Sequence, residues 1–284
     1  MKNALVFLLF LCIILWIIVF DLSEDSGLQV TFFDVGQGDS IFIETLEGRQ
    51  ILIDGGPDIT ILEKLGEEMP FWDRVIDLVI LTHPEHDHMS GLLEVLENYH
   101  IENILWTGVL KDTAEFKEWE KLIGEEGSRI TIAKAGDKIV LGDPEKEYIE
   151  ILFPFESLEG KEAFDANNTS VVSKLVFGDI SFLFFGDAYK SVEKELIEKG
   201  IDIDAEVLKV GHHGSKTSSS PEFIENVSPE FAVIQCGKDN TYGHPAPETL
   251  EVLGNYGINI FRTDLEGDIK LTVKNNKLYG VSDF

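Results

Sequence analysis

The chain of 284 residues has few cysteines and few basic side chains. Cys12 lies in an apolar N-terminal run and Cys236 in an expected strand, so neither a disulfide framework nor a cysteine-based metal site is available. The 23 Lys and Arg residues stand against 52 Asp and Glu, a formal net charge of −29, and no basic run interrupts the acids. This balance argues against a broad basic face for nucleic acid and leaves a metal-mediated phosphate contact open.

The remaining composition is that of a globular protein. Hydrophobic residues make up 44% and charged residues 26%, which excludes a disordered or fibrous chain. From residue 30 onward the sequence contains no linker, repeat or low-complexity stretch. We therefore expect one domain over residues 30–284, with an acidic surface.

Residues 4–20 form an uninterrupted apolar run. Its length is at the short limit for a membrane-spanning helix and slightly long for the core of a signal peptide, and no small-residue cleavage site ends it. We expect residues 1–21 to be a transmembrane anchor, with a cleaved signal sequence as the alternative, and residues 22–29 to be a linker. Lys2 before the run and acids after it favour a single-pass cell-membrane protein with an extracellular domain, or a secreted domain if the run is cleaved.

Hydrophobic periodicity predicts strands that alternate with helices. The expected strands are residues 30–34, 40–45, 50–54, 78–82, 104–106, 170–177, 180–185, 205–210, 231–235, 259–262 and 268–273. The expected helices are residues 91–99, 114–123, 192–199 and 247–256. Hairpins mixed with strand–helix alternation indicate an α/β fold in which two mixed sheets pack together with helices outside.

Three histidines and two acids lie between His83 and His88, directly after an apolar strand. Pro84 removes a backbone donor, so the strand must end there and the side chains splay from a loop at its carboxyl end. Imidazole and carboxylate groups suit hard-to-borderline divalent metals. The segment therefore predicts a metal site.

This segment resembles the His-x-His-x-Asp-His motif of the metallo-β-lactamase superfamily, in the His-Pro-Asp-x-Asp-His form of the soluble nuclease-like domain of the DNA-uptake protein ComEC. The resemblance places His83, Glu85, Asp87 and His88 on the four ligand positions. Glu85 departs from the family, which usually has His or Asp there. His86 falls on a variable position, and we expect it to face solvent or to support a ligand.

Further motifs follow in the order of that family. They are the strand–turn–strand at residues 33–40, Asp54-Gly55-Gly56, Asn167-Asn168-Thr169-Ser170, Gly186-Asp187-Ala188, Gly211-His212-His213-Gly214-Ser215 and Gly243-His244-Pro245. The resemblance implies an αββα sandwich in which Asp187 bridges two metal ions. It also favours His213 as a ligand and His212 as a catalytic group that contacts phosphate, and the reverse assignment remains open.

No histidine lies between His100 and His212, where the family's three-histidine zinc site takes one of its ligands. This argues against a β-lactam hydrolase. The expected ligand set instead combines Glu85, Asp87 and Asp187 with about three histidines. Such an oxygen-rich set suits two divalent ions, zinc or manganese, and also accepts magnesium.

Other candidate residues have two readings each. Asp34 and Asp54, at strand ends, either orient ligand imidazoles or are turn acids. Asn168 either fills the position of the missing histidine in substrate binding or caps a loop.

A second set of candidates lies near the closing motif. Ser215, Lys216 and Thr217 form a hydroxyl-plus-cation cluster that suits a phosphate oxygen or is an ordinary polar turn. His244 belongs to a late loop beside the expected pocket, where we expect it to contact substrate.

The resemblance implies a metal-dependent hydrolase, a phosphodiesterase or nuclease that acts through a metal-bound hydroxide outside the membrane, with Asp87 and His212 as catalytic residues. Two divalent cations and three carboxylates leave a local charge of +1, which matches a phosphodiester such as DNA. The alternatives are a hydrolase of a small envelope phosphoester and a non-catalytic metal-binding module of a DNA-uptake or envelope assembly. Protein partners are not indicated.

Overall fold

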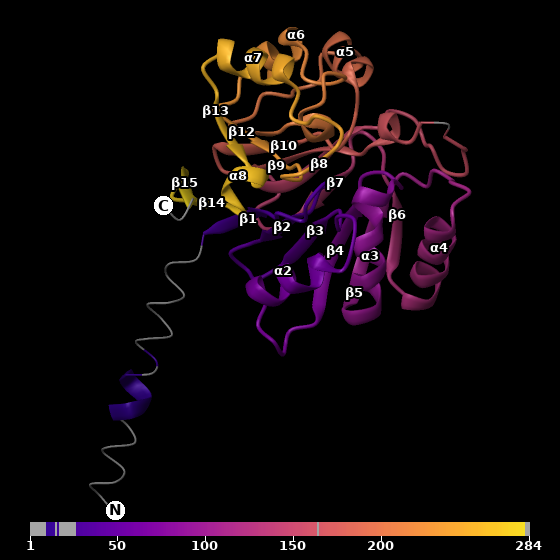
Figure 1. The fold of residues 1–284 in the computed structure, drawn as a ribbon. Helices are drawn as coiled ribbons and strands as arrows, with labels where there is room; N and C mark the ends of the chain where they lie inside the picture. The colour runs from indigo at the N-terminus through magenta and orange to yellow at the C-terminus, as the bar shows by residue number, and fades with distance from the viewer. Residues whose placement is uncertain (1–9, 15, 17–26, 164, 282–284) are drawn as a thin grey trace, which may run out of the picture.

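Two β-sheets stacked face to face, with helices on both outer surfaces, make up the fold (Figure 1). The computed structural model describes residues 10–14, 16, 27–163 and 165–281. The first sheet has the strand order β15(Lys277–Val281), β14(Ile269–Lys274), β1(Leu28–Phe32), β2(Ile41–Glu44), β3(Gln50–Ile53), β4(Val75–Leu81), β5(His100–Trp106), β6(Arg129–Ile132). The second sheet has the order β13(Asn259–Arg262), β12(Phe231–Ile234), β11(Val207–Lys209), β10(Ile180–Phe184), β9(Val172–Phe177), β8(Glu147–Phe153), β7(Lys138–Val140).

The helices divide between the two outer faces. Helices α2(Thr60–Glu68), α3(His86–Asn98) and α4(Ala114–Glu126) share one buried apolar cluster with the first sheet. Helices α5(Lys190–Glu198), α6(Pro221–Val227) and α7(Pro247–Asn255) share another with the second sheet. A short helix, α8(Thr263–Glu266), joins β13 to β14. The predicted αββα sandwich is confirmed.

The third apolar cluster fills the space between the sheets, and strand β4 shows how one sequence serves two clusters. Leu78 and Ile80 point toward the other sheet, whereas Val79 and Leu81 lie under the helices. Both faces are buried from Leu78 to Leu81, so this part of the strand is an unbroken apolar run rather than an alternating one. Its end therefore delivers the polar residues that follow to the junction of both layers.

All the expected strands and helices are present, with shifted ends, and several elements were not predicted. The largest shift concerns α3, which begins at His86 rather than at residue 91. The predicted loop is wrong for half of the motif, because Asp87 and His88 occupy the first helical turn. Their polar side chains hide the apolar periodicity that marks the rest of the helix. The unpredicted strands and α-helices are β6 to β8, β15, α2, α6 and α8.

The expected anchor and most of the linker lie outside the described residues. Of residues 1–21, only 10–14 and 16 are described. Within the part of the chain that the structure describes, we find no helix with the length and apolar character needed to cross a bilayer.

Helix α3 approaches the loop after β3 so closely that its position depends on Gly91. Gly55 donates a backbone hydrogen bond to His88 (2.8 Å), and Gly91 donates one to Gly56 (2.9 Å). A methyl group added at Gly91 would overlap the Gly55 carbonyl. The glycine therefore sets how closely the first turn of α3, with Asp87 and His88, packs on the loop after β3.

We predict that Gly91→Ala lowers the free energy of unfolding by about 1–3 kcal/mol, because the closely packed backbone must shift. Thermal unfolding of the full chain, followed by circular dichroism, measures the change. Matched controls are Gly66→Ala and Gly124→Ala, helical positions where an added methyl meets nothing within 4 Å. Alanine should stabilise these helices by about 1 kcal/mol. Equal melting temperatures for all three variants would contradict the close approach.

Candidate metal centre

The loop after β4 holds His83 in a fully buried position. Its Nδ1 lies 3.0 Å from the Thr82 hydroxyl and 3.2 Å from the Ser170 hydroxyl. Its Nε2 has no hydrogen-bond partner among the described residues. Burial lowers the pKa of His83 to about 3, so the ring is neutral and this nitrogen carries a free lone pair.

His88, in the first turn of α3, is aimed by a carboxylate behind it. Asp54 Oδ2 lies 2.8 Å from His88 Nδ1, and Asp54 also accepts hydrogen bonds from the Thr82 amide (2.8 Å) and hydroxyl (2.6 Å). A carboxylate bound to one ring nitrogen fixes the orientation of the imidazole and makes the other nitrogen a better ligand. Asp54 was expected either to orient a ligand imidazole or to be a turn acid. Its contact with His88 matches the first of these readings.

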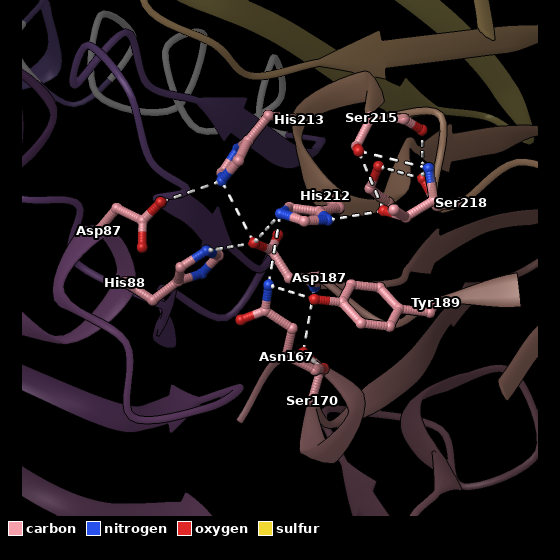
Figure 2. Close-up of polar contacts among 12 residues, drawn as sticks. Asp87, His88, Asn167, Ser170, Asp187, Tyr189, His212, His213, Ser215 and Ser218 are labelled. Atoms are coloured by element: carbon pink, nitrogen blue, oxygen red, sulfur yellow. Dashed lines mark hydrogen bonds and ion pairs between the residues drawn. The ribbon is translucent and has the colours of Figure 1, made fainter. Parts of the chain in front are cut away.

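Asp187 enters the same space from the second sheet, just after β10. Its backbone amide donates a hydrogen bond to the Ser170 hydroxyl oxygen (3.1 Å). Its Oδ2 lies 3.4 Å from both His88 Nε2 and His213 Nε2, and 3.7 Å from His212 Nε2. Figure 2 shows the three imidazoles directed toward this carboxylate. One aspartate thus joins groups from both sheets.

The histidine pair follows β11 in a tight turn with unusual backbone geometry. His212 and His213 have φ of 49° and 52°, the left-handed region that non-glycine residues seldom adopt. Such backbone strain persists only where surrounding contacts enforce it. Here the His212 amide donates to Gly186 (3.0 Å), and the Ser218 hydroxyl donates to the Gly211 carbonyl (2.6 Å). The turn sends the two rings to different places.

Side chains alternate between the two faces of β11 up to this turn. Val207 packs between the sheets, whereas Leu208 and Val210 pack under the outer helices. Strand alternation alone would place His212 on the apolar side. The left-handed turn instead leaves His212 at the rim and buries His213 in the cluster.

His213 is held from behind by groups that sequence reasoning missed. Its Nδ1 lies 3.0 Å from the Gln235 carbonyl and 3.2 Å from Asp39 Oδ1. Asp39 also forms a buried ion pair with Lys209. The available signal was Lys209 itself, a single charge in a strand whose other residues are apolar.

Charge in the cluster is balanced by mutual pKa shifts. Burial opposes protonation of His88 and His213, but the carboxylates of Asp187 and of Asp54 or Asp39 outweigh it and raise both pKa values well above normal. Burial likewise opposes ionisation of Asp187, yet His213 and His88 hold its pKa well below its usual range. The site is therefore built to pair buried carboxylates with positive charge.

The donor set fits a divalent metal ion. Within the described part of the chain, Nε2 of His83, His88 and His213 and Oδ1 of Asp187 are buried without a hydrogen-bond partner. Asp87, His88, Asp187 and His213 each offer one atom, and these atoms lie within 4.8 Å of one another. His83 stands beside this group, its ring 4.2 Å from that of His88. Imidazole nitrogens with carboxylates are typical ligands of zinc and manganese.

Two residues of the first motif lie apart from this group of four. Glu85 forms an ion pair with Lys111 on the cavity wall. His86 is exposed and contacts Glu115 and Ser90.

Of the two readings of Asn168, its contacts match the capping of a loop. Asn168 accepts a hydrogen bond from the Tyr189 amide (3.1 Å) and donates one to Ser191 (2.9 Å), so it caps the start of α5. Asn167 faces the cluster, with Nδ2 3.3 Å from His212 Nε2 (Figure 2). Asn167 was not among the expected site residues; because both residues share one short helical turn, the sequence does not show which of them points inward.

Four other candidates divide between the cavity and the surrounding turns. His244 lines the cavity, and burial together with the neighbouring histidines lowers its pKa to about 4. The Ser215 hydroxyl is buried and accepts from Thr217, and the Lys216 side chain is exposed. Asp34 accepts from the Gly36 amide (3.1 Å), which is the turn-acid reading.

A cavity of about 170 Å³ opens over the cluster. Besides the ligand candidates, its walls include Gln37, Asn167, His212, Tyr242 and His244. These side chains are polar donors and acceptors rather than an apolar lining. The volume suits one phosphate group and its immediate ester oxygens rather than a large apolar ligand.

Comparisons with known proteins agree with this geometry. The family model described as the metallo-beta-lactamase superfamily matches residues 33–238. ComE operon protein 3 of Bacillus subtilis is 31% identical over 93% of this chain and 35% of its own length. Competence protein ComA of Neisseria gonorrhoeae is 30% identical over 87% of this chain and 32% of its own length. The chain thus spans about a third of the length of these relatives.

Solved structures support the fold. The metallo-beta-lactamase fold protein YhfI from Bacillus subtilis superimposes with a TM-score of 0.57 at 11% identity, over 90% of this chain and 100% of that one. Igni18, a metallo hydrolase from Ignicoccus hospitalis, superimposes with a TM-score of 0.53 at 15% identity. The match covers 87% of this chain and 100% of Igni18. The resemblance predicted from the motifs is confirmed, and the chain belongs to the metallo-β-lactamase superfamily.

Proposed function

We propose that this chain is a metal-dependent phosphodiesterase, with DNA as the expected polymer substrate, held at the outer face of the cell membrane by residues 4–20. One observation carries the proposal: three buried imidazole nitrogens and one oxygen of Asp187, none with a hydrogen-bond partner among the described residues, lie beneath a small polar cavity. The competence proteins among the relatives favour DNA. The fold is that of metal-dependent hydrolases.

Asp87, His88, Asp187 and His213 would hold one ion, since their ligand atoms already converge. A second ion would draw on His83 and Asp187, with Glu85 as the remaining carboxylate on the cavity wall. When bound, divalent ions lower the pKa of water and polarise phosphoryl oxygens. Zinc and manganese suit this donor set, and magnesium is also accommodated.

His212 is placed to contribute a proton at the cavity. Its Nδ1 lies 2.9 Å from the Thr217 hydroxyl, which orients the ring, and its Nε2 lies on the side of Asn167 and Asp187. Burial lowers the pKa of His212, so its protonated form gives up the proton readily. We assign His212 to take a proton from solvent at Nε2 and to pass it to the leaving ester oxygen, while the proton of the attacking water leaves through another group.

Asp87 is the carboxylate that reaches both the cluster and the cavity. Its Oδ2 lies 3.3 Å from His213 Nε2, and about a third of its side chain is exposed at 31%. Burial opposes its ionisation, but His213 and His88 keep its pKa below normal, so the carboxylate is ionised. We assign Asp87 to accept a proton from the attacking water. Asn167 and His244 would donate hydrogen bonds to phosphate oxygens.

A small envelope phosphoester is the second candidate substrate. The 170 Å³ cavity accommodates one phosphate group, and the net charge of −29 repels a long polyanion at low ionic strength. A non-catalytic metal-binding module is the third reading. Metal content combined with turnover separates it from both enzymes.

We predict that the full chain, purified in detergent and loaded with Zn²⁺ or Mn²⁺, hydrolyses bis-p-nitrophenyl phosphate and single-stranded DNA. Because surface repulsion is screened by salt, the ratio of DNA to small-ester turnover should rise between 10 and 150 mM salt, conditions with Debye lengths of about 30 and 8 Å. Both rates are measured with each metal added in turn. Small-ester turnover without DNA cleavage at any salt would favour the envelope substrate. Bound metal without turnover would contradict an enzyme.

We predict that His213→Ala releases metal, whereas His212→Ala retains it and loses turnover by roughly 10²–10⁴-fold, the range for loss of a general acid. His213 is buried in the cluster, whereas His212 lies at the rim. Elemental analysis after dialysis, together with small-ester turnover, tests both. His86→Ala is the control and should match the wild type. If His212→Ala released metal and His213→Ala retained it, His212 would be the ligand and His213 the general acid.

A further inference from the structure

The loop between α2 and β4 exposes an aromatic pair. Phe71 and Trp72 are the most exposed large apolar side chains in the described ranges, at 80% and 72%. Their rings pack edge to face, with centroids 4.8 Å apart. Since monomeric proteins seldom expose adjacent large aromatic rings, such a pair indicates an interaction surface.

Polar contacts around the loop hold these rings outward. The Asp73 amide donates to the Pro70 carbonyl (2.8 Å), which closes a turn around the pair. The Asp73 carboxylate accepts from Gln50 (3.0 Å), and Arg74 donates to the Tyr99 hydroxyl (2.8 Å). The flanks of the loop are therefore fixed to the domain while the rings contact each other.

Sheet topology places this loop at the edge where the chain enters the domain. β2 is antiparallel to both β1 and β3, and β4 is parallel to β3, so β1 and β4 begin at the same edge. The two strands are three spacings apart, about 14 Å. The loop lies at the lower end of the domain in Figure 1. The site groups follow the opposite ends of β4, β10 and β11.

Chain length brings the same edge close to the apolar run. That run ends at residue 20, and β1 begins at Leu28. The seven residues between them reach at most about 25 Å when extended. If residues 4–20 lie in a bilayer, the loop is within reach of its surface.

We propose that this edge of the domain docks on a lipid bilayer through Phe71 and Trp72. Tryptophan and other aromatic rings favour the boundary between headgroups and acyl chains. Leu46, in the β2–β3 turn at the same edge, adds an exposed apolar side chain. A net charge of −29 opposes attraction to anionic lipids, so the contact is made by aromatic insertion into a surface of zwitterionic lipid.

Docking in this way fixes the direction in which the cavity of the metal centre opens relative to the bilayer. Strand β4 has seven residues and spans about 23 Å. The cavity therefore opens toward the aqueous phase, away from the bilayer. This inference extends the proposed function by orienting the site toward a water-borne phosphodiester rather than a lipid headgroup, and it does not depend on turnover.

The test uses the full chain carrying Trp16→Phe in phosphatidylcholine nanodiscs, prepared with plain or brominated acyl chains. Bromine quenches tryptophan only at close range, and Trp106 and Trp119 are buried at 7% and 0% exposure. We expect emission to fall in brominated discs. The fall should disappear when Trp72→Phe is added and persist when Trp106→Phe is added as the matched control.

Two results would overturn the proposal. Equal emission in plain and brominated discs, with Trp72 open to acrylamide, would show that the loop faces water. Protection from acrylamide only in discs that hold two copies would show that a second copy covers the pair. Small-ester turnover should be unchanged in Phe71→Ser/Trp72→Ser, so failure of docking and failure of the proposed activity are read separately.

Discussion

The contact of the Asp187 carboxylate with imidazoles from both sheets is the interaction on which the centre depends. His88 from the first sheet and His213 from the second lie at 3.4 Å from the same oxygen. A carboxylate in such a buried place is costly unless positive charge accompanies it. Protons on the histidines supply that charge in the free protein, and divalent ions supply it in the proposed enzyme. Asp54 behind His88 and Asp39 behind His213 keep both rings aimed at this point.

Much of the architecture could be predicted because burial leaves a periodic trace. The strands, the αββα layers and the sequence positions of the histidine and acid motifs are visible as apolar runs that end in polar clusters. Backbone conformation was harder to predict, because histidine at positions 212 and 213 does not indicate the left-handed conformation that both residues adopt. The choice between Asn167 and Asn168 depends on the rotation of one helical turn. Lys209 pairs with Asp39 across 170 positions of sequence, a contact that only the tertiary fold creates.

Overall charge and local charge act in opposite directions in this protein. The surface is strongly acidic, whereas the proposed ions create a small positive site within it. On the proposed function, a phosphodiester is drawn to the centre but not to the surface, which makes substrate choice sensitive to ionic strength. In the proposed docking, the aromatic loop at the far edge complements this arrangement, because it orients the domain without attracting polyanions. Together, the two proposals describe a membrane-held hydrolase whose centre faces the surrounding solution.

The most direct measurement of the central claim is the metal content and turnover of Asp187→Asn in the full chain. The amide keeps the size of the side chain but removes the charge that joins both sheets and both proposed ions. We expect folded protein by circular dichroism that has lost metal, as measured by elemental analysis after dialysis, together with most of its phosphodiesterase activity. Unchanged metal content with unchanged turnover would contradict a centre built on Asp187.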